Sequence, residues 1–308
     1  MRPGKPRYAP ANTAAWQNWV SAKSRSRRNP ATDHHHPLHT LGQENAVVRL
    51  IDTHTHLDFD PFDTDRGEVL ARSQRAGVER ILVLGVHQAN WARVWQLAQD
   101  EPCVHAALGL HPVFLQDHRA EHIDALRDWL LRLRGEDKLC AIGEIGLDYY
   151  IEDPAKERQQ TLLEAQLELA NEFELPVLLH VRRAHAQMIA TLKRHKLKRA
   201  GIAHAFSGSW EEAREYIRLG YKLGLGGAGT WPQAHRMHRV LKQLPLESIV
   251  LETDAPDIAP HSHAGQRNSP EFLTDICREL AALRGISAEE LAEASYRNSC
   301  ELFGWPAG

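Results

Sequence analysis

The sequence predicts an α/β fold in which eight parallel strands alternate with helices and close into a barrel. From Arg49 onward, short apolar runs rich in β-branched residues alternate with longer amphipathic segments. The short runs are almost continuously apolar, which is typical of parallel strands that are buried on both faces. Eight such units in about 260 residues fit a (β/α)8 TIM barrel. A doubly wound open sheet is the alternative, because periodicity alone does not count strands.

The predicted elements follow one another in a regular order. The strand predictions are the segments 49–54, 79–86, 103–109, 139–145, 176–181, 200–205, 221–226 and 248–253. Helices are predicted near 65–77, 90–100, 120–134, 155–173, 184–195, 211–219, 234–243 and 271–284. A last helix is predicted near 287–303, because Ser287 stands three residues before Glu290 in the spacing of a capping box.

The first 46 residues differ from the rest of the chain. They carry seven Lys and Arg residues against Asp33 and Glu44, a balance of +5, and they show no sustained periodicity. Because the whole chain has a net charge of −3, residues 47–308 carry about −8. We therefore predict two parts, a disordered basic extension at 1–46 and a barrel domain at 47–308. A surplus upstream start in the gene sequence is the alternative origin of the extension.

The bulk composition favours a globular cytoplasmic protein. Apolar residues make up 43% of the chain, which is enough to fill a core. The four cysteines are widely scattered, with no CxxC pair, which favours reduced thiols over a disulfide framework. No apolar run approaches the roughly 20 residues that span a bilayer, and the polar N-terminus lacks a secretory signal, so no membrane association is expected. The unusual feature of the composition is its 19 histidines.

Potential metal ligands stand at the ends of five predicted strands. They are His54, His56, Glu144, His180, His204 and Asp254. Taken singly, each also fits a hydrogen-bonded polar side chain at a strand end. Because the carboxyl ends of barrel strands meet at one mouth, all six are expected to converge there. Burying them together without a cation would be costly, so the pattern predicts a metal site.

The ligand types predict two divalent ions. Mixed imidazole and carboxylate ligands suit Zn, Mn, Fe or Co, with Mg less natural where histidines dominate. Four histidines and two carboxylates are enough for two ions if one carboxylate bridges them, and Glu144 is the candidate because its strand lies midway round the barrel. Two such ions activate a water and stabilise both oxygens of a displacement. Asp254 is predicted to bind one ion and to accept the proton of that water as general base.

Other residues at the predicted mouth are candidates for contacting substrate or supporting the ligands. His111 follows the third strand and is predicted to face substrate or to support a ligand. Arg182 or Arg183, after the fifth strand, is predicted to hold an anionic group such as phosphate, with a plain surface arginine as the alternative. Asp148 and Asp52 are predicted to orient histidines or loops.

These residues resemble the TatD family of metal-dependent deoxyribonucleases. The motifs that carry the resemblance are Asp52-Thr-His54-Thr-His56, Gly109-Leu-His111-Pro, Gly143-Glu144-Ile-Gly-Leu-Asp148, Leu-His180-Val-Arg182, His204-Ala-Phe-Ser207-Gly208 and Glu252-Thr253-Asp254-Ala-Pro256. The resemblance runs from about Leu50 to Phe303, and segments such as Leu223-Gly-Leu-Gly-Gly-Ala look closest to the YjjV-like branch. It implies that His54, His56 and Asp254 bind one metal and that His180 and His204 bind the other, with Glu144 as the bridge. Nothing carries over to residues 1–46.

The family resemblance implies hydrolysis of a phosphodiester bond, with DNA or a short oligonucleotide as substrate and no protein partner to infer. The first alternative is hydrolysis of a small-molecule ester, lactone or amide in the same barrel superfamily. The second is a non-catalytic metal-binding scaffold, which the complete ligand set disfavours. A barrel near −8 lacks a global basic field for DNA, so the expected patch is small. Its candidate members are Arg182, Arg183, Arg236, Arg239 and Arg267.

Overall fold

The computed structural model describes residues 48–307, and the prediction made for 1–46 lies outside these residues. Eight parallel strands pair in chain order. They are β1 (Leu50–Thr55), β2 (Val78–Leu84), β3 (Val104–Leu108), β4 (Leu139–Asp148), β5 (Val177–Arg182), β6 (Gly201–Ala203), β7 (Lys222–Leu225) and β8 (Ile249–Leu251). A parallel bridge between Thr55 and Ala255 joins the end of β1 to the segment after β8. The predicted TIM barrel is therefore confirmed, and the open-sheet alternative is wrong.

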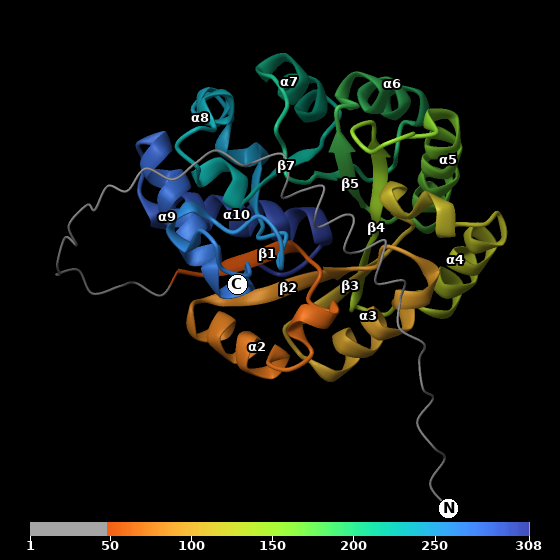
Figure 1. The fold of residues 1–308 in the computed structure, drawn as a ribbon, viewed down its shortest axis with the longest axis horizontal. Helices are drawn as coiled ribbons and strands as arrows, with labels where there is room; N and C mark the ends of the chain where they lie inside the picture. The colour runs from red at the N-terminus through yellow and green to blue at the C-terminus, as the bar shows by residue number, and fades with distance from the viewer. Residues whose placement is uncertain (1–47, 308) are drawn as a thin grey trace, which may run out of the picture. The chain divides into compact units, whose positions relative to one another are not determined.

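Helices follow the strands and lie outside them (Figure 1). The α-helices are α2 (Arg66–Arg75), α3 (Gln88–Asp100), α4 (Glu121–Arg132), α5 (Lys156–Phe173), α6 (His185–His195), α7 (Trp210–Arg218), α8 (His235–Leu241), α9 (Leu273–Arg284) and α10 (Ala288–Phe303). Short 3-10 helices are η1 (Asp60–Phe62), η2 (Pro112–Asp117), η3 (Gly227–Thr230), η4 (Leu246–Ser248), η5 (His261–His263) and η6 (Pro270–Phe272). The Ser287 hydroxyl accepts a hydrogen bond from Glu290 N at 3.1 Å, so α10 begins where the sequence predicts.

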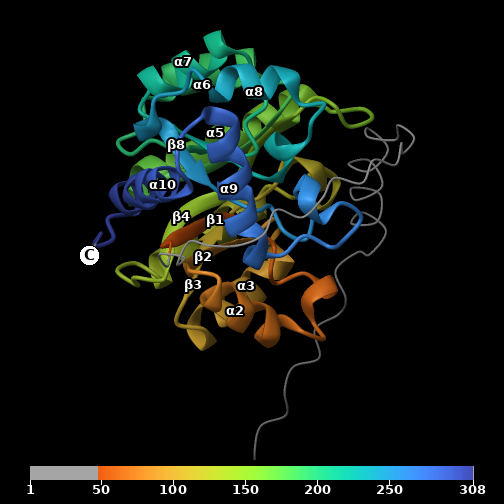
Figure 2. The ribbon, with the colours of Figure 1, turned by 90° about the vertical axis from the view of Figure 1, so that its left-hand side faces the viewer.

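The barrel has two apolar layers. The larger one lies between the strands and the outer helices. The smaller one combines alternate strand residues, such as Leu82 and Leu178, with Tyr296, Cys300 and Phe303 of α10. Figure 2 shows α10 lying beside β1 and β8. We call the end of the barrel that α10 covers the floor and the opposite end, where the strands terminate, the mouth.

The smaller core leads directly into the polar residues of the mouth. Because alternate residues of a strand share a face, Leu178 and His180 of β5 lie on one side of their strand. The same holds for Ile202 and His204, at and just beyond β6. Each chain segment therefore supplies an apolar side chain to the core and, two residues later, an imidazole to the mouth.

Two strands break this simple alternation before they reach the mouth. In β1, the partners of Asp52 and Thr55 on β2 are Ile81 and Val83, so β1 carries one extra residue between them. The pairing of β4 with β5 shows the same irregularity between Ile142 and Ile145. A bulge of this kind changes the direction of the side chains that follow it. His54 lies within the first irregularity and Glu144 within the second.

The cysteines and the lengths of the helices bear on two further predictions, reduced thiols and no membrane span. All four cysteines are buried and free. Within residues 48–307, no helix has both the length and the apolar character needed to cross a membrane.

Candidate active site

The carboxylate of Glu144 lies at the centre of a buried group of histidines. Its Oε2 is 3.2 Å from Nε2 of His54 and 3.2 Å from Nε2 of His56. Its Oε1 is 3.0 Å from Nδ1 of His180 and 2.9 Å from Nε2 of His204. All five residues are at most 5% exposed, so water screens their charges little. The structure thus brings together residues from four separate strand ends.

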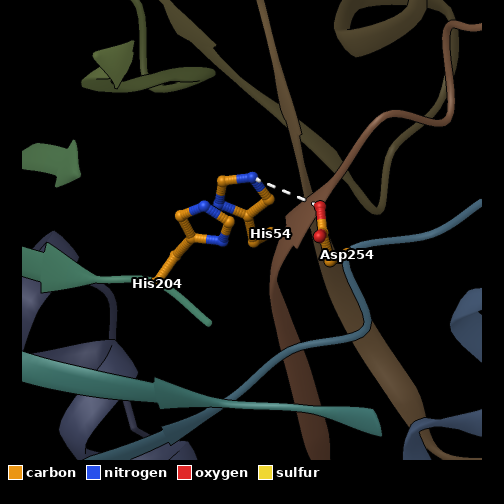
Figure 3. A group of neighbouring side chains, drawn as sticks. All are labelled: His54, His204 and Asp254. Atoms are coloured by element: carbon orange, nitrogen blue, oxygen red, sulfur yellow. Dashed lines mark ion pairs between the residues drawn. The ribbon is translucent and has the colours of Figure 1, made fainter. Parts of the chain in front are cut away.

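Asp254, the sixth predicted ligand, borders the same group. Its Oδ1 lies 3.8 Å from Nε2 of His54 and 3.7 Å from Nε2 of His56. Figure 3 shows its carboxylate directed toward His54, whose ring stacks on His204 with the ring centres 3.9 Å apart. The Asp254 backbone N donates to the His54 carbonyl at 2.9 Å, which fixes the segment after β8 against β1. The six predicted ligands therefore form one continuous cluster.

The cluster has the donor chemistry of a cation site. Three sets of ligand atoms lie within 4.8 Å of one another: His54 with His204 and Asp254, His54 with His56 and Glu144, and His111 with Glu144 and His180. His54 belongs to two of these sets, and so does Glu144. Sharing of ligands between adjacent sets is the arrangement that a pair of neighbouring ions needs. Imidazole and carboxylate ligands of this kind fit Zn or Mn, and Mg less well.

The electrostatics of the cluster also favour positive charge next to Glu144. Burial alone would raise the pKa of the Glu144 carboxyl, but His111, His204 and His54 hold it well below its usual value. Burial would lower the pKa of His204, yet Glu144 and then Glu252 outweigh it and raise that pKa to about 10. The carboxylates therefore stabilise positive charge in this cavity, which is the property that a divalent ion requires.

Two carboxylates outside the predicted ligand set lie beside the rings of His180 and His204. Asp148 Oδ2 is 3.0 Å from Nε2 of His180, which leaves Nδ1 of that ring directed at Glu144. Glu252 Oε1 is 3.6 Å from Nδ1 of His204. A Cβ on Gly224 would lie 2.1 Å from Glu252 Oε2, so a glycine is needed there to admit the carboxylate. A hydrogen-bonded carboxylate such as Asp148 fixes the tautomer and orientation of a metal-binding imidazole.

The orienting role predicted for Asp148 matches its contact with His180, whereas Asp52 binds backbone and hydroxyl groups. Asp52 accepts hydrogen bonds from Thr253 Oγ1 at 2.6 Å and from Thr253 N at 2.9 Å. Burial raises the pKa of Asp52 to about 8. Sequence reasoning missed Glu252, although one signal was present. Glu252 stands two residues before Asp254 and follows β8 directly, so it too lies at a strand end.

The two predicted substrate contacts occupy different environments. His111 is only 1% exposed, and its Nδ1 accepts a hydrogen bond from Val113 N, so Nε2 carries the proton and donates to Glu144 Oε1 at 2.9 Å. Arg182 is half-buried at the end of β5, with its guanidinium over the ring of Tyr150. The predicted basic patch is smaller than expected, because Arg267 is engaged with Asp65 in an ion pair at 2.6 Å.

Comparisons with known proteins agree with this geometry. Residues 51–304 match the family described as TatD related DNase. The chain is 44% identical to the uncharacterised metal-dependent hydrolase YjjV of Escherichia coli K12, over 84% of this chain and all of that protein. The crystal structure of YjjV, described as a TatD homologue, matches with a TM-score of 0.81 over 84% of this chain and 100% of its own. A 3′-5′ ssDNA/RNA exonuclease TatD of Pantoea vagans is 34% identical over 82% of this chain and 99% of that protein.

Proposed function

This chain belongs to the TatD family of metal-dependent hydrolases, and from that premise we propose that it hydrolyses phosphodiester bonds in DNA or short oligonucleotides. Its similarity to the TatD exonuclease of Pantoea vagans supports a nucleic acid as substrate. The alternative function is hydrolysis of a small-molecule ester, lactone or amide. The experiment described below distinguishes the two functions.

One observation carries the proposal: four imidazoles surround a single buried carboxylate, with Asp254 beside them. The imidazole nitrogens of His54, His56, His180 and His204 lie 2.9–3.2 Å from the oxygens of Glu144. We assign His54, His56 and Asp254 to one divalent ion, His180 and His204 to a second, and Glu144 to the bridge between them. The ions are Zn, Mn or Mg in this proposal.

The two ions, when bound, supply positive charge that lowers the pKa of the attacking water and stabilises charge on the phosphate. The chain's own residues do the rest. Asp254 accepts the proton of the attacking water, because its carboxylate is the one at the edge of the group. Asp148 keeps the ring of His180 in the orientation that directs Nδ1 at Glu144. Glu252 places negative charge near Nδ1 of His204, whose Nε2 faces Glu144. His111 holds Glu144 through its Nε2 proton.

The charge of the barrel favours a strand end or a short oligonucleotide over a long duplex. A domain with about −8 outside the first 46 residues has little general attraction for DNA. Binding therefore depends on the ions and on a few arginines at the mouth.

The experiment strips the full chain of metal and reloads it with Mg²⁺, Mn²⁺ or Zn²⁺. Each form is tested on end-labelled single-stranded DNA beside a panel of esters, lactones and amides. We expect release of nucleotides from the DNA with at least one metal, and no release by Asp254→Ala prepared in the same way, which controls for a contaminating nuclease. Cleavage of a small molecule alone, at full metal occupancy, would replace this proposal with the alternative.

A further inference from the structure

Two arginines at the mouth share one aromatic ring. The guanidinium carbon of Arg182 lies 4.0 Å from the centre of the Tyr150 ring, and that of Arg183 lies 4.4 Å from the same centre. Tyr150 is half-buried and Arg183 is exposed. Stacking on an aromatic ring stabilises a guanidinium through its face and leaves the N–H groups at its edge free. We call Tyr150, Arg182 and Arg183 the arginine pair site.

The backbone fixes this site next to the metal-ligand cluster. Arg182 pairs with Asp148 in the register of β4 and β5, and its carbonyl accepts a hydrogen bond from Tyr149 N at 2.9 Å. Tyr150 N donates to Asp148 Oδ1, also at 2.9 Å. Arg182 lies two residues beyond His180, about 7 Å further along the same face of the strand. The arginine pair site therefore lies directly beside the metal-ligand cluster.

Within the described residues, the two guanidiniums form no ion pair, although the charge of Arg182 helps to lower the pKa of the nearby Asp148 carboxyl. Among residues 48–307, no carboxylate forms an ion pair with Arg182 or Arg183, and neither side chain donates a hydrogen bond. Two other arginines stacked on rings of this protein do have such partners, whereas Arg80, Arg132 and Arg134, also stacked on rings, form no ion pair with a described carboxylate. Arg267 lies 4.4 Å over Phe62 and places two nitrogens on the carboxylate of Asp65, at 3.0 and 2.6 Å. Arg49 lies over Tyr296 and binds Glu79 in the same way.

We propose that the arginine pair site binds a phosphate group of the substrate other than the one that is cleaved. Two like charges next to one ring repel each other, and an anion between them removes that repulsion. A planar guanidinium binds phosphate through two parallel N–H groups, which matches the donors left free here. The inference rests on the proposed function and adds to it a contact with the neighbouring nucleotide.

The chemistry admits two sources, a phosphate at the end of the strand and the phosphate of the adjacent linkage. Both carry the oxygens that a guanidinium recognises. Probes that differ in a single phosphate separate them, because a methylphosphonate linkage is neutral and resists hydrolysis.

The test measures binding of labelled oligothymidylates to the metal-loaded full chain by fluorescence anisotropy. In the first probe only the terminal linkage is a methylphosphonate, so the probe is not cleaved there. In the second probe the adjacent linkage is neutral as well, and a third probe adds a terminal phosphate to the first. Each probe is made for both the 5′ and the 3′ end.

We expect the wild type to bind at least one probe that carries the extra phosphate about 10-fold to 100-fold more tightly than its neutral counterpart, the usual range for charge-assisted contacts. The double variant Arg182→Gln/Arg183→Gln is expected to bind both members of that pair equally. Arg75→Gln, an exposed arginine at the C-terminal end of α2, removes one charge elsewhere and is expected to keep the wild-type preference. Tyr150→Phe keeps the ring and is expected to retain the preference, whereas Tyr150→Ala reduces it.

Two results would overturn the inference: a wild type that does not distinguish the probes, or a double variant that still does. Neither depends on hydrolysis. If the wild type distinguishes the probes through Arg182 and Arg183 but cleaves no phosphodiester, the phosphate site stands and the proposed reaction fails. If it cleaves DNA and the double variant keeps the preference, the reaction stands and the site fails.

Discussion

The two ends of this barrel are built from the same strands and have opposite character. At the floor, Phe303 and Tyr296 of α10 belong to one apolar cluster with Leu178 and other strand residues. At the mouth, two residues further along β5, His180 is buried among carboxylates and other imidazoles. Apolar burial stabilises the fold, while buried ionisable groups cost stability unless charges compensate them. The change from one role to the other takes place within two residues of a single strand.

This contrast predicts that activity and stability can be separated by mutation. In TIM barrels the C-terminal ends of the strands carry the active site and the N-terminal end carries stability. Substitutions at the mouth should therefore abolish activity without lowering the free energy of unfolding. Substitutions at the floor should lower the free energy of unfolding without changing the activity of the folded protein.

The largest effect is expected from Asp254→Ala and His204→Ala. Each removes a predicted ligand, and Asp254→Ala also removes the predicted general base, so we expect kcat/KM to fall about 10³-fold or more. The free energy of unfolding of the metal-free variants should remain near the wild-type value, because truncation also relieves a buried cluster of charges. Steady-state kinetics and urea unfolding measure the two quantities. Asp128→Ala, an exposed carboxylate on α4, serves as the control. Wild-type rates in either mouth variant would refute the assigned roles.

Phe303→Ala tests the opposite end. Phe303 is 8% exposed and belongs to the core that closes the floor, so its truncation leaves a cavity. We expect the free energy of unfolding to fall by about 3 kcal/mol, as for other large-to-small changes in cores. The kcat of the protein that remains folded should be unchanged.

Leu131→Ala is the matched control for the floor, because Leu131 is 49% exposed and its truncation opens no cavity. It should change the free energy of unfolding by no more than about 0.5 kcal/mol. A loss of kcat in Phe303→Ala, measured per folded molecule, would show that floor and mouth are coupled.

Bound metal should raise the free energy of unfolding through the ligands at the mouth, and substitutions at the floor should not change this increment. A ligand that binds only the folded state adds about 2.7 kcal/mol to the free energy of unfolding at 100 times its dissociation constant. We expect this increment in the wild type and in Phe303→Ala, and its loss in Glu144→Gln, which keeps the shape of the side chain but removes its charge. Thermal unfolding with and without a chelator measures the increment. An undiminished increment in Glu144→Gln would mean that the metal binds elsewhere.

Much of the mouth could be predicted because parallel topology brings strand ends together regardless of detailed packing. Once His180 and Asp254 are assigned to strand ends, the closed barrel requires them to lie at the same end. The short apolar strand runs and the Ser287 cap could also be predicted, since both depend on residues close in sequence.

The parts that escaped prediction depend on contacts between distant segments. The extra residues in β1 and β4 appear only when each strand is paired with its neighbour, so the direction of Glu144 could not be derived from alternation. β4 also continues three residues beyond its predicted end, to Asp148, because it pairs with β5 as far as Arg182. The support that Glu252 gives to His204 depends on the glycine at 224, on a different strand.

The smallest effect concerns a histidine at the floor, and it gives that end a pH dependence of its own. His105 packs against the ring of Trp305, with the ring centres 4.6 Å apart. Burial, together with the charges of Lys138 and Arg80, lowers the pKa of His105 to about 4. In the unfolded chain this imidazole takes up a proton near pH 6.5, whereas the folded protein resists it until about pH 4. Between these values the unfolded state binds more protons, so stability falls as the pH falls.

His105→Leu removes the titrating group and keeps an apolar side chain of similar size against Trp305. Between about pH 7.5 and about pH 5, the wild type should lose about 2 kcal/mol more free energy of unfolding than the variant. Urea unfolding of the metal-free proteins at the two pH values measures the difference, and the metal-free form is chosen so that loss of ligands at the mouth does not contribute. Equal losses in the two proteins would show that protons enter elsewhere, and the floor would then stabilise the barrel through apolar packing alone.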